Sequence, residues 1–263
     1  MSELDDHIKG IRGWLEKQGY PLEMSVARSL FLSGLGIVQG SNYEDPDTNQ
    51  AREIDILSRS YAYNVHALLL QGIIECKYSS QPLVAFTYGG DLEKSPIDFW
   101  APCNNAGRIV LNQLIQDKIA NTIPAFAPRN TIAYSIKQAN SKDEGQKNSI
   151  FEAVMSVVKA SYFLSNLYET KAKYTPSQDK QSSQLVAFIG LPIIIVRAPL
   201  FICYLDHKHE IAVEPRASVL LEWTYPKVGT MMINIIQERE VVNLASDLAK
   251  SITMFDTQLK RYF

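Results

Sequence analysis

The sequence predicts an α/β or α+β fold built around one mixed sheet. Stretches with apolar residues at helical spacing alternate with strand-like runs rich in branched and aromatic residues. Their order is helix, three strands, a long helix, a strand and further strands, which is typical of a mixed sheet flanked by helices. With 263 residues, 46% of them hydrophobic, the chain is long enough to bury its own core, and we expect a single domain over 1–263.

Two short helices open the predicted fold. Residues 5–17 place apolar side chains at helical spacing and are followed by Gly19, a common stop signal. Pro21 suits the first turn of a second helix, which carries an apolar stripe and ends at Gly34 or Gly36.

A three-stranded antiparallel meander is expected next. The polar stretch 44–49 contains Asp-Pro and is typical of a turn, and 60–64 forms a second polar break. The three strands are expected at 37–43, 52–59 and 66–78.

The second half of the chain mixes both element types. Residues 79–105 are rich in Gly and Pro, so we expect a loop with at most short strands. Helices are expected at 106–119, 146–171 and 241–252, and a polar connection at 174–184. The remaining strands are expected at 131–137, 191–197, 200–205, 210–213, 219–223 and 231–236.

Composition bounds the function classes. The 26 basic and 28 acidic residues leave a formal charge of −2, so a nucleic-acid enzyme would need a local basic surface or a partner protein that supplies one. The three cysteines form no CxxC pair, which argues against a disulfide framework or a zinc knuckle. No phosphate-binding GxxxxGK[ST] or GxGxxG motif stands in the required context.

The sequence also indicates a location. Residues 1–9 are polar and lack an apolar signal core, so we expect a cytoplasmic protein. The most membrane-like stretch, 185–205, is interrupted by Pro192, Arg197 and Pro199. Two buried strands joined at Ala198-Pro199 explain it better than a membrane span.

An acidic residue and a lysine end the third predicted strand. In Glu75-Cys76-Lys77 the two charged side chains point to the same side of a strand, at the end of an apolar run. Buried charges on such a strand are costly unless they pair, bind metal or line a wet cleft. Two other triplets also have an acidic residue and a lysine separated by one residue, but neither ends an apolar strand. Residues 169–171 lie on a predicted helix, and 206–208 are predicted to form a hairpin turn.

With Glu23 on a leading helix, Asp55 on the second strand and Glu75-Cys76-Lys77 on the third, the chain resembles the PD-(D/E)XK superfamily of restriction-endonuclease-like nucleases. The core of that superfamily is a helix, a three-stranded meander, a crossover helix and a fourth strand. The resemblance covers about 10–200, with a long insertion at about 79–145 and a C-terminal strand extension at about 200–263.

The resemblance implies the chemistry. Asp55 and Glu75, with Glu23, would hold Mg²⁺ or Mn²⁺, hard cations that prefer carboxylate oxygens. Lys77 would position or deprotonate the attacking water and stabilise charge on the phosphate. Ile54 stands where the motif's name has Pro, and Glu53 is either an extra ligand or a solvated charge.

The resemblance further implies a metal-dependent nuclease that acts on DNA, in restriction or anti-phage defence by analogy only. A homodimer would suit double-strand cutting, although the sequence specifies no interface. Two alternatives stay open: a structural Asp55 to Lys77 ion pair, and a catalytically silent interaction or assembly module that uses the strands of 200–236.

Three further residues are weaker candidates. His207 and His209 have a spacing that suits a metal on a strand, but a solvent-exposed turn explains them more simply. Cys103 precedes a helix that could stabilise a thiolate, yet no histidine partner is fixed by the sequence, so we expect an inert thiol.

Overall fold

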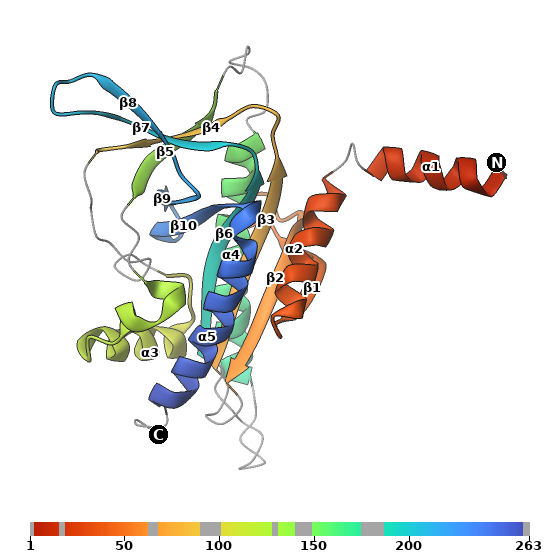
Figure 1. The fold of residues 1–263 in the computed structure, drawn as a ribbon. Helices are drawn as coiled ribbons and strands as arrows, with labels where there is room; N and C mark the ends of the chain where they lie inside the picture. The colour runs from red at the N-terminus through yellow and green to blue at the C-terminus, as the bar shows by residue number, and fades with distance from the viewer. Residues whose placement is uncertain are drawn as a thin grey trace.

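The computed structural model describes residues 3–15, 19–62, 68–89, 101–127, 131–139, 149–174 and 187–259. Its strands are β1 (Gly36–Glu44), β2 (Ala51–Ala62), β3 (Leu68–Tyr78), β4 (Leu83–Thr87), β5 (Ile132–Gln138), β6 (Ala187–Arg197), β7 (Leu200–Leu205), β8 (Ile211–Pro215), β9 (Ser218–Tyr225) and β10 (Gly229–Gln237). They form one ten-stranded mixed sheet in the order β1-β2-β3-β6-β10-β9-β5-β4-β7-β8. Figure 1 shows this strongly twisted sheet.

Helices flank the sheet on both faces. They are α2 (Tyr20–Leu32), α3 (Asn105–Gln116), α4 (Ser149–Tyr174) and α5 (Val241–Leu259), with short 3₁₀ turns η1 (Ala120–Thr122), η2 (Pro124–Phe126) and η3 (Glu238–Glu240). The first helix, α1 (Glu3–Leu15), projects from the body instead (Figure 1). Buried residues of α2, α3 and α5 share one core with the sheet, whereas those of α4 belong to the core on the opposite face. The predicted mixed α/β architecture is therefore confirmed.

The predicted meander is also confirmed. β1 pairs antiparallel with β2, and β2 pairs antiparallel with β3. β3 then pairs in parallel with β6 along its whole length, from Leu68 opposite Ala187 to Tyr78 opposite Arg197. Both strands are almost entirely buried, as expected for parallel strands covered on both faces. The long helix α4 lies between them in the chain.

The second half of the sheet combines segments that are far apart in the sequence. β10 pairs in parallel with β6 and antiparallel with β9. β4 and β5 come from the stretch 79–145, yet they lie between β9 and β7, which come from 200–263. The predicted insertion and the predicted C-terminal extension therefore contribute to one continuous sheet.

Several element boundaries differ from the sequence-based expectation, among them the end of α3, the start of β6 and the end of α5. α3 ends at Gln116, because Lys118 adopts a positive φ of 57° and the chain continues into η1. β6 begins at Ala187, four residues earlier than expected, because 187–190 pair with the start of β3. α5 continues to Leu259, and its buried Phe255 ring packs edge-on against Phe126 at 5.8 Å.

Some expectations fall outside the described residues. The start of the long helix at 146–148, most of the polar connection at 174–184 and the loop residues 90–100 are among them. Within the described part of the chain, no helix combines the length and apolar composition needed to cross a bilayer.

Candidate active site

Asp55 and Glu75 lie where β2 and β3 stop pairing. The register of these two strands ends at Ile56 opposite Ile74, one residue before each carboxylate is reached. β3 continues alongside β6, with Glu75 opposite Ile194. Beyond the last strand pair, the Asp55 carboxylate Oδ2 accepts a hydrogen bond from the backbone N–H of Cys76 at 2.7 Å. At this point a hydrogen bond to the Asp55 side chain therefore replaces the backbone hydrogen bonds between β2 and β3.

Glu75 and Lys77 form an ion pair on the α4 side of the sheet. Ile73 and Leu69 lie on the same face of β3 as Glu75, and they pack in the core beneath α4. The distance from Lys77 Nζ to Glu75 Oε1 is 2.9 Å. Glu75 is only 5% exposed. Its other oxygen, Oε2, is buried and has no hydrogen-bond partner among the described residues.

The environment raises the pKa of all three predicted carboxylates. Burial, followed by the Asp55 charge, raises the pKa of Glu75 from 4.5 to about 7, although Lys77 opposes the shift. Burial also raises the pKa of Asp55, against the effect of the Cys76 N–H bond. Burial and the charges of Asp55 and Glu53 raise the pKa of Glu23. The three groups therefore lie close enough to disfavour one another's ionisation.

Lys77 remains an ammonium ion in this setting. Burial lowers its pKa, but the charge and hydrogen bond of Glu75 and the charge of Asp55 outweigh that effect, so the pKa is raised overall. Glu152, in the first turn of α4, also favours the charged form. Lys77 is thus poorly suited to take a proton and well suited to stabilise negative charge.

Glu23 reaches the site from α2. Four residues of this helix, Leu22, Val26, Ala27 and Leu30, are buried and anchor it against the sheet. Glu23 Oε1 lies beside Gly19 at the start of its own helix, where an added Cβ would be 3.3 Å away. Glu53, in contrast, is exposed and lies beside Gly40 of β1. The structure therefore places Glu23, Asp55, Glu75 and Lys77 in one electrostatic cluster, with Glu53 at its margin.

The carboxylates of the cluster are ligands that a hard cation prefers, but their oxygens do not surround a common point where a metal ion could bind. Within the described residues, no group of three or more His, Cys, Asp and Glu side chains is arranged to hold a metal ion. Asp55 is engaged by Cys76 N–H, and one Glu75 oxygen by Lys77. The buried Glu75 Oε2 without a partner is the atom that fits an oxygen-seeking cation, because carboxylate oxygens are the preferred ligands of Mg²⁺.

The remaining sequence candidates have structural explanations. Glu169 accepts hydrogen bonds from the backbone and side chain of Asn105 at 2.9 and 2.7 Å, at the start of α3. Residues 206–208 form the predicted hairpin turn between β7 and β8, closed by bonds to Asp206. His207 and His209 are exposed in this turn. Burial raises the pKa of Cys103 to about 11, so its thiol stays protonated.

Sequence reasoning missed a second charged cluster. Asp45, in the stretch predicted as a polar turn, is 3% exposed, and both of its oxygens accept from Lys159 Nζ at 3.0 and 2.9 Å. Lys159 also lies 2.9 Å from Asp47, which accepts a hydrogen bond from Tyr225 at 2.7 Å. The available signal was a single lysine within the apolar face of α4.

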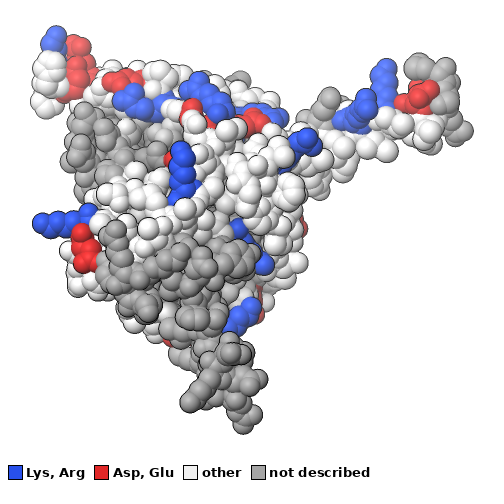
Figure 2. Space-filling view, turned by 60° about the horizontal axis from the view of Figure 1, so that its bottom comes forward, with Lys and Arg blue, Asp and Glu red and all other residues white. Residues whose placement is uncertain are grey.

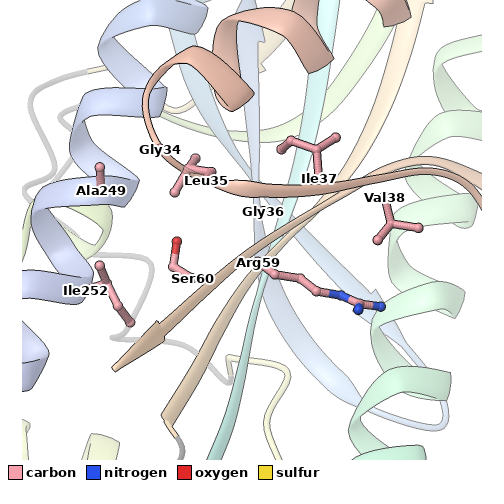
Figure 3. Close-up of a pocket in the computed structure, with 9 residues that line it drawn as sticks. All are labelled: Gly34, Leu35, Gly36, Ile37, Val38, Arg59, Ser60, Ala249 and Ile252. Carbon is pink, nitrogen blue, oxygen red and sulfur yellow. The ribbon is translucent and has the colours of Figure 1, made fainter. Parts of the chain in front are cut away.

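A cavity of about 550 Å³ lies away from the cluster of Glu23, Asp55, Glu75 and Lys77. It is bounded by the connection between α2 and β1, by Arg59 and Ser60 of β2, and by α5. Figure 3 shows Ser60 and α5 on one side and the Arg59 side chain extending towards Val38 on the other. None of the four predicted catalytic residues lines it. The candidate active site is therefore defined by its charged side chains and not by this cavity.

Comparison with known proteins finds no matching family model, no matching curated protein and no matching solved structure.

Proposed function

We propose that this chain is a metal-dependent nuclease of the PD-(D/E)XK type. The observation that carries the proposal is the buried Glu75, paired with the half-buried Lys77 beside Asp55, at the point where two strands part. Three carboxylates with raised pKa values and a retained ammonium form a cluster in which each charge costs free energy of desolvation, and such costly charges gather at functional sites.

The arrangement of elements supports the same proposal. α2, the meander β1 to β3, the crossover helix α4 and the parallel strand β6 follow the core order of that superfamily. The three carboxylates stand on the elements where the superfamily carries its metal ligands. A fold likeness does not by itself assign a function, so the site carries more weight than the topology.

The residues divide the work of phosphodiester hydrolysis. Asp55, Glu75 and Glu23 would hold Mg²⁺ or Mn²⁺, which when bound would neutralise charge at the scissile phosphate. Lys77, held in place by Glu75, stabilises the negative charge that develops on the phosphate oxygens. Glu75 orients the Lys77 ammonium through its Oε1, and its Oε2 would be offered to the metal. We propose DNA as the substrate.

The test is cleavage of linear, circular and single-stranded DNA, and of RNA, in Mg²⁺ or Mn²⁺, with EDTA as the metal-free control. Lys77→Ala should abolish cutting. Lys137→Ala, which removes an exposed lysine of β5, is the matched control and should cut normally. Equal cutting by Lys77→Ala and the unaltered protein would rule out this site.

One observation favours a second function, in assembly. β8 is one of the two edge strands of the sheet, and the β7 to β8 hairpin extends from the body (Figure 1). Leu205, Ile211 and Val213 are exposed on it, and Leu205 lies opposite Ile211. Exposed apolar patches on edge strands are typical of interaction sites. Three results together would favour this function over the nuclease. The protein would leave nucleic acids intact, calorimetry would detect no binding of Mg²⁺ or Mn²⁺, and Ile211→Lys would change the oligomeric state.

A further inference from the structure

Helix α1 presents an apolar stripe to solvent. Leu4, Ile8, Ile11 and Trp14 are 65%, 41%, 57% and 53% exposed. Figure 1 shows the helix projecting from the body of the molecule. The ring of Trp14 lies 5.8 Å from that of Tyr20, at the start of α2. The stripe thus remains open along most of its length.

A helix of this kind is marginal without a partner. It has 13 residues, and isolated helices shorter than about 12–15 residues are barely stable in water. Gly10 and Gly13 lie within it and have no atom within 4 Å of their Cβ positions. Each glycine weakens the helix relative to alanine, because it loses more backbone freedom when the helix forms. Packing of the apolar stripe is therefore the main source of stability available to α1.

The spacing of the stripe is that of a two-helix coiled coil. Three residues of the stripe, Leu4, Ile8 and Ile11, are followed by the half-buried Leu15. The four residues are separated by intervals of four, three and four, which are successive d, a, d and a positions of a heptad. Such a narrow seam buries itself against one similar helix. In an antiparallel pair, Ile8 packs on Ile11 of the second copy, and Leu4 packs on Leu15 of the second copy.

The charges of α1 complement the same helix in the antiparallel direction. Asp5 and Arg12 occupy the two e positions beside the seam, and e positions face each other in an antiparallel pair. Asp5 of one copy therefore faces Arg12 of the second copy, and the contact occurs twice by symmetry. Figure 2 shows the basic side chains of α1 nearer the body of the molecule and its acidic side chains nearer the far end of the helix.

We propose that α1 is a self-association helix that joins two copies of this chain in an antiparallel coiled coil. An anionic lipid surface is a poorer occupant, because Glu3, Asp5 and Asp6 outnumber Lys9 and Arg12. The helix is about 20 Å long at 1.5 Å per residue, so the interface is small and the dimer is expected to be weak. The proposal does not depend on nuclease activity.

Sedimentation equilibrium of the full chain, from micromolar to millimolar concentrations, tests the proposal with charge reversals. Asp5→Arg and Arg12→Asp should each weaken the dimer about tenfold or more. An equimolar mixture of the two variants should restore it, because one copy then carries arginine at both e positions and the other copy carries aspartate at both.

Asp6→Arg is the matched control. It makes the same charge change near the helix start, but at an f position that points away from the seam, so the dimer should persist. A monomer at every concentration, a loss of dimer in Asp6→Arg equal to that in Asp5→Arg, or a mixture that stays monomeric would overturn the proposal.

Discussion

The backbone N–H of Cys76 donates to the Asp55 carboxylate at 2.7 Å, at the point where β2 and β3 separate. This single bond gives Asp55 two roles. It satisfies a backbone donor that has lost its strand partner, and it fixes the carboxylate next to Glu75. The two roles can be separated by substitution.

Asp55→Asn should keep the fold and lose the activity. The amide oxygen can still accept from Cys76 N–H, and the neutral side chain avoids the desolvation that raises the Asp55 pKa, so stability should be unchanged or slightly higher. Asp55→Ala leaves the Cys76 N–H without its acceptor and should cost about 1–3 kcal/mol. Both variants should cut DNA about 100-fold more slowly or worse. Urea unfolding and cleavage rates measure the two effects, and equal unfolding midpoints for the two variants would contradict the structural role.

Glu75 should make the protein less stable as the pH rises. Its pKa is raised from 4.5 to about 7, so the folded state retains a proton that the unfolded chain has released between these values. The stabilising contribution is complete below pH 4.5 and is lost as the pH rises through about 7. At about 1.4 kcal/mol per pKa unit, the loss is on the order of 3 kcal/mol.

Glu75→Gln provides the measurement. The variant carries no titrating group at this position, so its free energy of unfolding should fall less than that of the unaltered protein between pH 4.5 and about 7. Parallel curves for the two proteins would contradict the assignment of a buried, raised pKa to Glu75.

Local pattern was sufficient for the meander and for the core of the site. Alternation along β3 places Glu75 and Lys77 on one face, and two polar turns determine that Asp55 returns beside them. The prediction needed only neighbouring strands, for which sequence separation is short. Glu23 was a candidate only through the family resemblance, because its local pattern does not show where its helix packs against the sheet.

Long-range pairing was not predictable from the same pattern. β6 and β7 are joined through Ala198-Pro199, yet β10, β9, β5 and β4 lie between them in the sheet. Apolar periodicity indicates that a strand is buried but does not specify which distant strand lies beside it. The burial of Asp45 was missed for a related reason, since its partner Lys159 lies 114 residues further along the chain.

Glu23 should matter more to the reaction than Glu53. Burial and the Asp55 charge raise the pKa of Glu23, whereas Glu53 is exposed beside β1. Glu23→Gln removes a carboxylate from the cluster and should lower Mg²⁺ affinity or activity about 10–100-fold. Glu53→Gln is the matched control and should change either quantity less than about threefold. Calorimetric titration with Mg²⁺ and a cleavage assay give the comparison, and equal losses in both variants would argue against a specific role for Glu23.

Lys159 should contribute far more to stability than Lys227, although both contact the same turn. The Lys159 side chain is 14% exposed and pairs with the buried Asp45, whereas that of Lys227 is 42% exposed and lies 3.3 Å from Asp47. Lys159→Met leaves the buried Asp45 carboxylate with only the more exposed Arg52, 3.8 Å away, in place of two hydrogen bonds from Lys159, which should lower the free energy of unfolding by about 2–4 kcal/mol. Lys227→Met removes a solvent-screened pair and should cost less than about 1 kcal/mol. Because Lys159 joins the β1 to β2 turn to α4, its loss should also loosen β2 and reduce cutting by displacing Asp55. Thermal unfolding and cleavage rates of the two variants test this, and equal stability of the two would contradict the proposed difference.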